Sequence, residues 1–221
     1  MKKTTIQVLP SILSFDFANL GSESKRLEQA GADALHIDIM DGLFVPNLTL
    51  GPKAVAAIKR SCNLFLDVHL MIYNPFDYVE RFAEAGADRI TFHLEATEQV
   101  EETLAYIRKC NVKAGLAFSP ETSVEMIPRY LDKCDLILLM TVNPGFGGQA
   151  FIPEVLEKVG FTREACKTRG IALDIQVDGG IDDKTASLCV KEGANLLVSG
   201  TYLQKAKDLK QAIQSLKEAN A

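Results

Sequence analysis

A short segment of the chain, residues 35–42, alternates apolar side chains with side chains that can do chemistry. Because successive side chains of a β-strand point to opposite faces, this segment read as a strand sends His36, Asp38 and Met40 to one face. An imidazole and a carboxylate on the same strand face are unusual for core packing and common in metal sites. The segment is therefore the first candidate for a functional site.

Two further segments repeat the pattern. Residues 66–71 carry His69, and residues 174–180 carry Asp178 followed by two glycines. Polar groups that converge inside a fold need a cation or a substrate as a partner. Two imidazoles and two carboxylates suit Zn²⁺, while Fe²⁺, Mn²⁺ and Co²⁺ accept the same ligands. The predicted ligands of one divalent ion are His36, Asp38, His69 and Asp178.

These residues must be positioned by regular elements, and the chain alternates short aliphatic runs with amphipathic stretches of about ten to fifteen residues, typical of βα units. The expected strands start near Gln7, Ala34, Leu64, Arg89, Lys113, Asp135, Ala172 and Asn195, each followed by a helix-like stretch. Glycines at 31, 86 and 193 fall where helices should end, in left-handed caps. We predict an α/β fold, a single (β/α)8 TIM barrel over residues 1–221. A doubly wound sheet is the alternative.

In such a barrel, active groups are expected at the carboxyl ends of the strands and in the loops that follow them. The chain places polar or sulfur-containing side chains at these positions on six strands, namely Ser11, His36, Asp38, Met40, His69, Met71, His93, Met140 and Asp178. His93 has no evident partner in the sequence, so core packing, support of a ligand and contact with substrate all stay open. Asp41 and Asp67 are candidates for orienting the ligands or capping local backbone.

Composition narrows the class of protein. The 221 residues are 47% hydrophobic and 24% charged, enough to bury a sizeable core. A net charge of −5 without basic clusters argues against a nucleic-acid partner. The run after Met1-Lys2-Lys3 is short and mixed, and no apolar segment approaches the ~20 residues that a membrane span requires. We therefore expect no membrane partner.

The cysteines indicate a reducing compartment. Their number is odd, they are widely spaced, and no two form a C-x-x-C pair. Such residues are expected to be buried thiols, and a cytoplasmic location follows. The five are Cys62, Cys110, Cys134, Cys166 and Cys189.

Five motifs, in order and over nearly the whole chain, resemble the ribulose-phosphate 3-epimerase family. They are Leu9-Pro10-Ser11-Ile12-Leu13-Ser14, His36-Ile37-Asp38-Ile39-Met40-Asp41-Gly42 with Phe44-Val45-Pro46-Asn47, Asp67-Val68-His69-Leu70-Met71, Asn143-Pro144-Gly145-Phe146-Gly147-Gly148-Gln149 and Val177-Asp178-Gly179-Gly180. The chain departs from the family at Thr201, where Ser is frequent, and at residues 202–204. These departures touch the loop after the eighth strand.

The resemblance implies interconversion of D-ribulose 5-phosphate and D-xylulose 5-phosphate, a reaction of the pentose phosphate pathway or Calvin cycle type. Inverting the carbon beside a ketone removes a proton, forms an enediolate and returns a proton to the opposite face. The resemblance assigns these two acid/base roles to Asp38 and Asp178, and has both also bind the metal with His36 and His69. The resemblance also implies a homo-oligomer, either a dimer or a hexamer.

Phosphate would be bound by glycine-rich loops, because backbone N–H groups can turn toward an anion where no side chain obstructs them. Loops after the last strands of this fold commonly hold phosphate. Ser199 is a further candidate. The predicted substrate-binding residues are Ser11, His69, Gly145, Phe146, Gly147, Gly148, Asp178, Gly179, Gly180, Gly200 and Thr201.

Two features could protect the enediolate from water. Met40, Met71 and Met140 fall at strand ends and could form a polarizable cap over it, with plain core packing as the alternative. Residues 41–50 form a long connection that could close over the mouth as a lid.

Three other functions compete with this interpretation. A decarboxylase or aldolase on a related barrel is disfavoured, because the chain has no Asp-x-Lys-x-x-Asp motif and no lysine at the end of a predicted strand. A non-catalytic sugar-phosphate sensor would not need the four ligand residues. An allulose 6-phosphate 3-epimerase is the closest alternative, since substrate length is poorly encoded in the motifs.

Overall fold

The computed structural model describes residues 5–219, so the prediction for the segment that begins Met1-Lys2-Lys3 lies outside the described residues. All eight strands are parallel and form one sheet in the order β1-β8-β7-β6-β5-β4-β3-β2. A bridge between Ser11 and His36 joins the two ends of this sheet. The strands are β1 (Gln7–Pro10), β2 (Ala34–Met40), β3 (Phe65–Met71), β4 (Arg89–His93), β5 (Lys113–Phe118), β6 (Leu136–Met140), β7 (Asp174–Asp178) and β8 (Leu196–Ser199).

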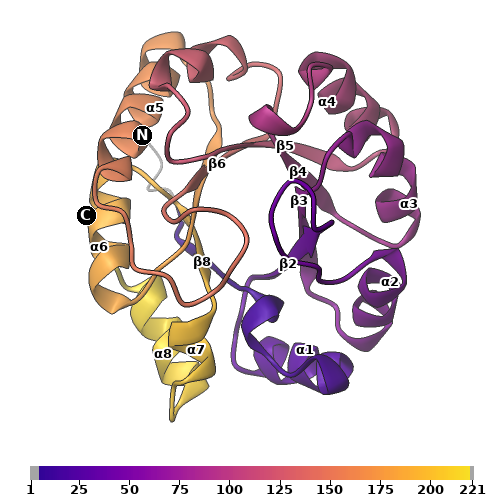
Figure 1. Ribbon diagram of the computed structural model, residues 1–221. Coiled ribbons are helices and arrows are strands. Elements are labelled where there is room, and N and C mark those ends of the chain that lie inside the picture. The colour runs from indigo at the N-terminus through magenta and orange to yellow at the C-terminus, as the bar shows by residue number, and fades with distance from the viewer. Residues whose placement is uncertain (1–4, 220–221) are drawn as a thin grey trace.

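Helices surround this ring of strands (Figure 1). They are α1 (Leu20–Gln29), α2 (Pro52–Ser61), α3 (Val79–Glu84), α4 (Val100–Lys109), α5 (Val155–Arg169), α6 (Asp183–Glu192), α7 (Thr201–Gln204) and α8 (Leu209–Lys217). Short 3₁₀ helices add η1 (Ile12–Ser14), η2 (Phe17–Asn19), η3 (Pro75–Tyr78), η4 (Leu94–Ala96) and η5 (Val124–Arg129). The barrel prediction is confirmed, and the doubly wound sheet is excluded. That residues 1–221 form one domain stays a prediction.

Four strands start one or two residues later than predicted, at Phe65, Leu136, Asp174 and Leu196. The reason is clear for β6 and β8, because the polar residue before each strand uses its side chain on a neighbouring strand. Asp135 Oδ2 accepts a hydrogen bond from the Ala114 amide at 2.8 Å. Asn195 Oδ1 does the same for the Ile175 amide, also at 2.8 Å.

The helix-like stretch predicted after β5 forms the 3₁₀ helix η5 rather than an α-helix, and η5 contains Pro128. Proline has no backbone N–H to donate and disfavours the helical conformation of the residue before it. The predicted glycine caps agree with the structure, since φ is positive at Gly31, Gly86 and Gly193.

Within the described residues, no helix is long and apolar enough to cross a bilayer. All five cysteines are free thiols. Four are buried, as predicted, but Cys110 is only partly buried because it lies at the carboxyl end of α4.

Strand alternation separates two apolar regions. In β2, Leu35, Ile37 and Ile39 belong to the large core between the sheet and the helices. Their neighbours in the strand point the other way, into the lumen of the barrel. A second, smaller cluster contains Leu9, Ala34, Ala117, Leu136, Leu138, Met140, Val142, Leu196 and Val198. These residues come mainly from β1, β5, β6 and β8, so this side of the lumen is apolar.

The other side of the lumen is polar. β2, β3, β4 and β7 supply the buried side chains His36, Asp38, Asp67, His69, Arg89, Thr91, His93 and Gln176. Gly115 of β5 leaves space beside this group, because a methyl group there would overlap the Thr91 hydroxyl and lie 3.0 Å from Leu136 Cδ2. The glycine therefore permits the close packing of β4, β5 and β6.

We predict that Gly115→Ala lowers the free energy of unfolding by about 1–3 kcal/mol, the usual result of overpacking a dense interior. Urea unfolding would measure it. Gly51→Ala is the matched control, because nothing lies within 4 Å of the added methyl group and φ is −142°. Equal stability of the two variants would contradict the prediction.

Candidate metal centre and active site

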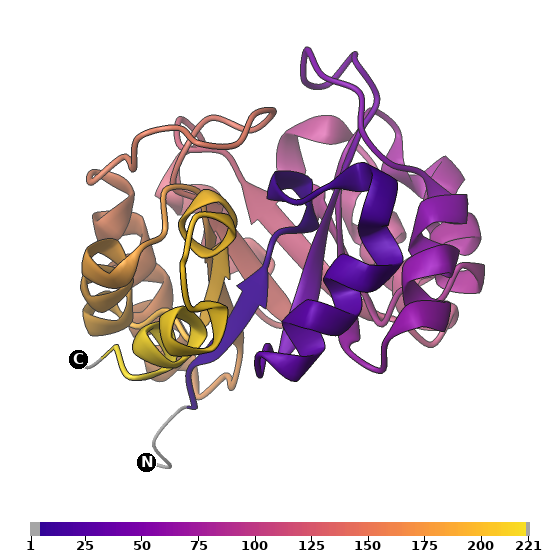
Figure 2. The same cartoon turned by 90° about the horizontal axis from the view of Figure 1, so that it is seen from below.

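A cavity of about 330 Å³ lies at the carboxyl ends of the strands. Figure 2 shows the loops around residues 41–50 and 143–150 rising from the same end of the barrel. Loops after β1, β6, β7 and β8 line the cavity, together with Asp38, Met40 and Met71. Six of the nine residues predicted at the strand ends therefore line one cavity, namely Ser11, Asp38, Met40, Met71, Met140 and Asp178.

The four predicted ligands lie together beneath this cavity. One ligand atom from each of them lies within 4.8 Å of all the others. Register explains this, because β2 pairs Asp38 with His69 of β3 across the sheet. His36 Nε2 lies 3.3 Å from His69 Nδ1 and 3.3 Å from Asp38 Oδ1. Asp178 Oδ2 is 3.5 Å from His36 Nε2 and 3.8 Å from His69 Nδ1.

These spacings suit a divalent ion. Four ligands placed tetrahedrally at about 2.0–2.2 Å from a zinc ion lie roughly 3.4 Å from one another. Two neutral imidazole nitrogens and two carboxylate oxygens are also the donors that such an ion accepts. The group His36, Asp38, His69 and Asp178 can therefore hold a metal ion, as its geometry and chemistry both fit.

A buried carboxylate orients the first imidazole. Asp67 Oδ2 lies 2.9 Å from His36 Nδ1 and also accepts a hydrogen bond from Gln176 Nε2 at 2.6 Å. Arg89 Nε donates to the other oxygen, Asp67 Oδ1, at 2.7 Å. His36 Nδ1–H is thereby directed at Asp67, which leaves Nε2 as the nitrogen that faces the ligand group.

The second imidazole contacts a third. His69 Nε2 lies 2.9 Å from His93 Nε2, and His93 Nδ1 lies 3.1 Å from Glu95 Oε2. Core packing, support of a ligand and contact with substrate were all open for His93. Its ring is fully buried and lies against the predicted ligand His69, which favours support of a ligand. Glu95 is a residue that the sequence reasoning missed. It follows the strand in η4 rather than ending it, so strand alternation gave no signal for it.

Buried carboxylates surround His36 and shift its pKa. Burial alone would lower the pKa of His36, but the charge of Asp38 and hydrogen bonds with Asp178, Asp38 and Asp67 raise it well above its usual value. Burial likewise opposes ionisation of Asp38, yet His36 and His69 hold the pKa of this carboxyl well below its usual range. The carboxylates therefore favour a cation among them.

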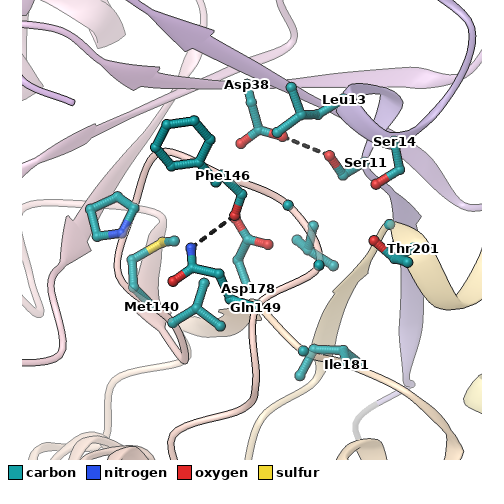
Figure 3. A pocket seen from close by; sticks show the side chains of 18 of the residues that line it. Ser11, Leu13, Ser14, Asp38, Met140, Phe146, Gln149, Asp178, Ile181 and Thr201 are labelled. Atoms are coloured by element: carbon teal, nitrogen blue, oxygen red, sulfur yellow. Dashed lines mark hydrogen bonds between the residues drawn. The ribbon is translucent and has the colours of Figure 1, made fainter. Parts of the chain in front are cut away.

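Asp38 and Asp178 approach the cavity from strands that β1 and β8 separate. Figure 3 shows both carboxylates directed into the pocket. Ser11 donates its hydroxyl hydrogen to Asp38 Oδ2 at 2.6 Å, so the carboxylate keeps a fixed orientation. Asp178 is held by its backbone, whose carbonyl accepts a hydrogen bond from the Thr141 amide at 2.8 Å. Two carboxylates directed into one cavity can exchange protons with a bound molecule.

Glycine-rich segments border the cavity on the side of β6, β7 and β8. At Gly180, φ is +64° and a Cβ atom would lie 2.8 Å from the backbone nitrogen of Phe151, so only glycine fits there. The predicted binding residues Ser11, Gly145, Phe146, Gly147, Gly148, Asp178, Gly179, Gly180, Gly200 and Thr201 all line the cavity, whereas His69 lies below it in the ligand group. Ser199 does not line it, because its hydroxyl donates to the Ile181 carbonyl.

Ser14 was not among the predicted site residues, although it ends the first motif. It lies in η1 and lines the cavity. A Cβ atom on Gly147 would be 3.7 Å from its hydroxyl oxygen, and one on Gly200 would overlap it. Figure 3 shows Ser14 and Thr201 on the side of the pocket opposite Met140. Two hydroxyls thus accompany the glycine segments.

The three methionines line the same cavity. Met40 and Met71 pair across β2 and β3 and pack with Val45, while Met140 belongs to the apolar side of the lumen. Each is almost fully buried, with at most 4% of its surface exposed. Their position fits both the cap and the core interpretation, so the cap stays a proposal.

The loop after β2 meets the loop after β6 across the mouth. Asn47 Nδ2 donates to the Gly145 carbonyl at 2.8 Å. Asp41 organises the first loop by accepting hydrogen bonds from the amides of Leu43, Phe44 and Tyr73. The loop therefore has a defined shape and touches a predicted substrate-binding segment.

Taken together, the fold and site define a (β/α)8 barrel with a candidate metal centre of two histidines and two aspartates below a glycine-bordered cavity. Solved barrels share this fold. KGPDC from Streptococcus mutans superposes with a TM-score of 0.71 at 15% identity over 97% of this chain and 97% of its own. The tryptophan synthase α-subunit of Pyrococcus furiosus gives 0.72 at 14% identity over 98% and 99%. At this identity the likeness concerns the fold alone.

Sequence comparison is more specific. The model of the ribulose-phosphate 3-epimerase family matches residues 7–204. The ribulose-phosphate 3-epimerase of Chlamydia pneumoniae is 55% identical over 94% of this chain and 92% of its own length. That of Bacillus subtilis is 48% identical over 96% and 98%, and the chloroplastic enzyme of Arabidopsis thaliana 44% over 97% and 77%. The chain belongs to the ribulose-phosphate 3-epimerase family, whose members are enzymes that catalyse this epimerisation.

Glu95 should make the free energy of unfolding depend on pH. Burial raises its pKa, but hydrogen bonds with His93, Thr122 and the Ser119 amide outweigh burial and lower the pKa from 4.5 to about 2. As the pH falls, the Glu95 carboxylate is therefore protonated at a higher pH in the unfolded chain than in the folded protein. We predict that the contribution of Glu95 is fully present above pH 4.5 and is lost as the pH falls toward 2.

Unfolding free energies of the parent protein and Glu95→Gln, measured from neutral pH downward, should converge in this range. Glu98→Gln, at an exposed position nearby, is the control. A difference between parent and Glu95→Gln that does not change with pH would contradict the prediction.

Proposed function

We propose that this protein interconverts D-ribulose 5-phosphate and D-xylulose 5-phosphate, with Asp38 and Asp178 as the two acid/base groups. The single observation that carries the proposal is the convergence of both carboxylates on one cavity, beside two histidines that can share a metal ion with them. Family membership supports the choice of substrate.

The reaction needs two proton-transfer groups on opposite faces of the reacting carbon. One carboxylate removes the proton at carbon 3, which leaves an enediolate, and the other returns a proton from the opposite face. Ser11 holds Asp38 in one orientation through its 2.6 Å hydrogen bond, so that the free oxygen faces the ligand group. The two aspartates exchange roles when the reaction runs in reverse.

A divalent ion bound by His36, Asp38, His69 and Asp178 would stabilise negative charge on the substrate oxygens as a Lewis acid. We propose Zn²⁺ as this ion, with Fe²⁺, Mn²⁺ and Co²⁺ as alternatives. Asp67 and His93 contact the two imidazoles, and Met40, Met71 and Met140, which line the cavity, would exclude water from the reacting carbon.

The glycine segments are proposed to bind the phosphate. Residues 145–148, 179–180 and 200–201 border the cavity. Backbone N–H groups and the Ser14 and Thr201 hydroxyls can donate to phosphate oxygens there. A phosphate held in this way would place carbon 3 of a five-carbon sugar at the two carboxylates.

Allulose 6-phosphate remains the second candidate substrate, because the cavity of about 330 Å³ could also take one more carbon. Closure of loop 41–50 as a lid belongs to the same proposal, supported by the hydrogen bond of Asn47 to Gly145. The homo-oligomer, as a dimer or a hexamer, and the cytoplasmic location stay predictions. A relative carries a chloroplast location in its name, so location varies within the family.

The decisive test follows D-ribulose 5-phosphate in D₂O by NMR, before and after chelation and return of Zn²⁺. We expect xylulose 5-phosphate with deuterium at carbon 3, lost on chelation and restored by metal. Product that survives exhaustive chelation would remove the metal from the mechanism. Absence of product with ribulose 5-phosphate, but turnover of allulose 6-phosphate, would favour the second candidate.

The two carboxylates can be separated in the same assay. Asp38→Asn and Asp178→Asn should each reduce epimerisation at least about a hundredfold, because general acid–base groups contribute roughly 10²–10⁴-fold and each is used once per turnover. Each variant reloaded with metal should exchange the carbon 3 proton of one epimer only, and the two variants should differ in which epimer exchanges. Retention of a tenth of the parent activity would remove that residue from the role.

Ser14 offers a test of the phosphate site. Ser14→Ala should raise KM for ribulose 5-phosphate about tenfold, since a hydrogen bond to a charged group contributes about 1.5–3 kcal/mol. Its kcat should change little, because the phosphate is remote from carbon 3. Ser187→Ala on α6 is the control. Turnover of phosphate-free D-ribulose should be equal in parent and variant, and an equal loss with both sugars would contradict a phosphate contact.

A further inference from the structure

The chain contains three histidines, and all three lie in one line of contacts. His36 Nε2 is 3.3 Å from His69 Nδ1, and His69 Nε2 is 2.9 Å from His93 Nε2. The line ends at Glu95, whose Oε2 is 3.1 Å from His93 Nδ1. A metal at His69 would use Nδ1, the nitrogen that faces the other ligands, so the ring proton of His69 must then sit on Nε2.

We propose that Glu95 and His93 are positioning residues that fix the ring proton of His69 on Nε2 and so keep Nδ1 free to bind metal. This inference rests on the metal site of the proposed function. Glu95 would act through two imidazole rings, and neither its carboxylate nor the His93 ring would touch the ion.

The direction of the hydrogen bonds carries the argument. An ionised carboxylate can only accept, so Glu95 requires the proton of a neutral His93 to be on Nδ1. His93 Nε2 must then accept, and the only donor that His69 can offer it is Nε2–H.

The surroundings of Glu95 are built to keep it an acceptor. Its Oε1 receives the Ser119 amide at 2.9 Å and the Thr122 hydroxyl. Lys158 of α5 fixes this turn by donating to the carbonyls of Ser119, Pro120 and Thr122 at 3.0, 3.0 and 2.6 Å. The Ser119 hydroxyl lies farther from His93 Nδ1, at 3.4 Å. The carboxylate therefore presents Oε2 to His93 and Oε1 to the turn.

These contacts make one substitution informative. In Glu95→Gln, the Ser119 amide still requires an acceptor, so the amide oxygen of Gln must take the place of Oε1. Its NH₂ group then faces His93 Nδ1 and donates to it. The order of donors reverses along the line, so that His93 Nε2–H donates to His69 Nε2 and the His69 proton moves to Nδ1. Metal binding must displace that proton.

The experiment measures the dissociation constant of Zn²⁺ by chelator competition, and the tautomer of His69 in the metal-free protein by two-bond ¹H–¹⁵N correlation. We expect Glu95→Gln to bind Zn²⁺ about 10–100-fold more weakly, the usual effect of losing support behind a metal ligand. The His69 proton should lie on Nε2 in the parent and on Nδ1 in the variant. Saturating Zn²⁺ should restore kcat, because Glu95 does not touch the substrate.

Thr122→Val is the matched control, since it removes a donor to Glu95 but leaves the carboxylate facing His93. Affinity of Glu95→Gln that is less than tenfold weaker than that of Thr122→Val would overturn the inference, as would an unchanged His69 tautomer. Failure of the parent protein itself to bind Zn²⁺ would instead remove the metal from the proposed function, so the two failures are distinguishable.

Discussion

The fully buried carboxylate of Asp67 is the interaction on which the interior of this barrel depends. It contacts side chains from three other strands, namely His36 of β2, Arg89 of β4 and Gln176 of β7. A charge at this depth is tolerated only when it is paired and hydrogen-bonded. Arg89 supplies the counter-charge, and the charge of Arg89 and hydrogen bonds from His36 and Arg89 outweigh burial and lower the pKa of Asp67. One group therefore joins the strands and orients a candidate metal ligand at the same time.

The lumen has a polar and an apolar side because the buried Asp67 carboxylate needs hydrogen-bond donors around it. Polar side chains gather on the strands that reach Asp67, while β1, β5, β6 and β8 contribute aliphatic residues. The apolar side supplies packing and a low dielectric, in which the hydrogen bonds of the polar side are stronger. Strand alternation ties both sides to the outer core, because a shift of one residue in β2 would exchange Ile37 and Ile39 for His36 and Asp38. The same register thus specifies the fold and the candidate site.

The sequence predicted those site residues that lie on one face of a strand or at its carboxyl end. His36 and Asp38 stand two residues apart in a strand, and Asp178 ends one, so their convergence followed once a barrel was expected. The positions of Glu95 and Ser14 could not be predicted in this way, because both lie in 3₁₀ turns whose side-chain directions depend on tertiary contacts. The type of helix after β5 could not be predicted from the apolar pattern alone, because Pro128 lies within a stretch that otherwise resembles an α-helix.

The layer formed by Asp67, Arg89 and Gln176 also closes the interior. Asp67 and Gln176 are fully buried and Arg89 is 4% exposed, so within residues 5–219 this layer covers the candidate ligand group on the side away from the cavity. The cavity at the carboxyl ends of the strands lies on the other side of the group. A molecule bound in the cavity would therefore stand between the candidate metal centre and bulk water, and solvent would exchange with the centre more slowly while the cavity is filled.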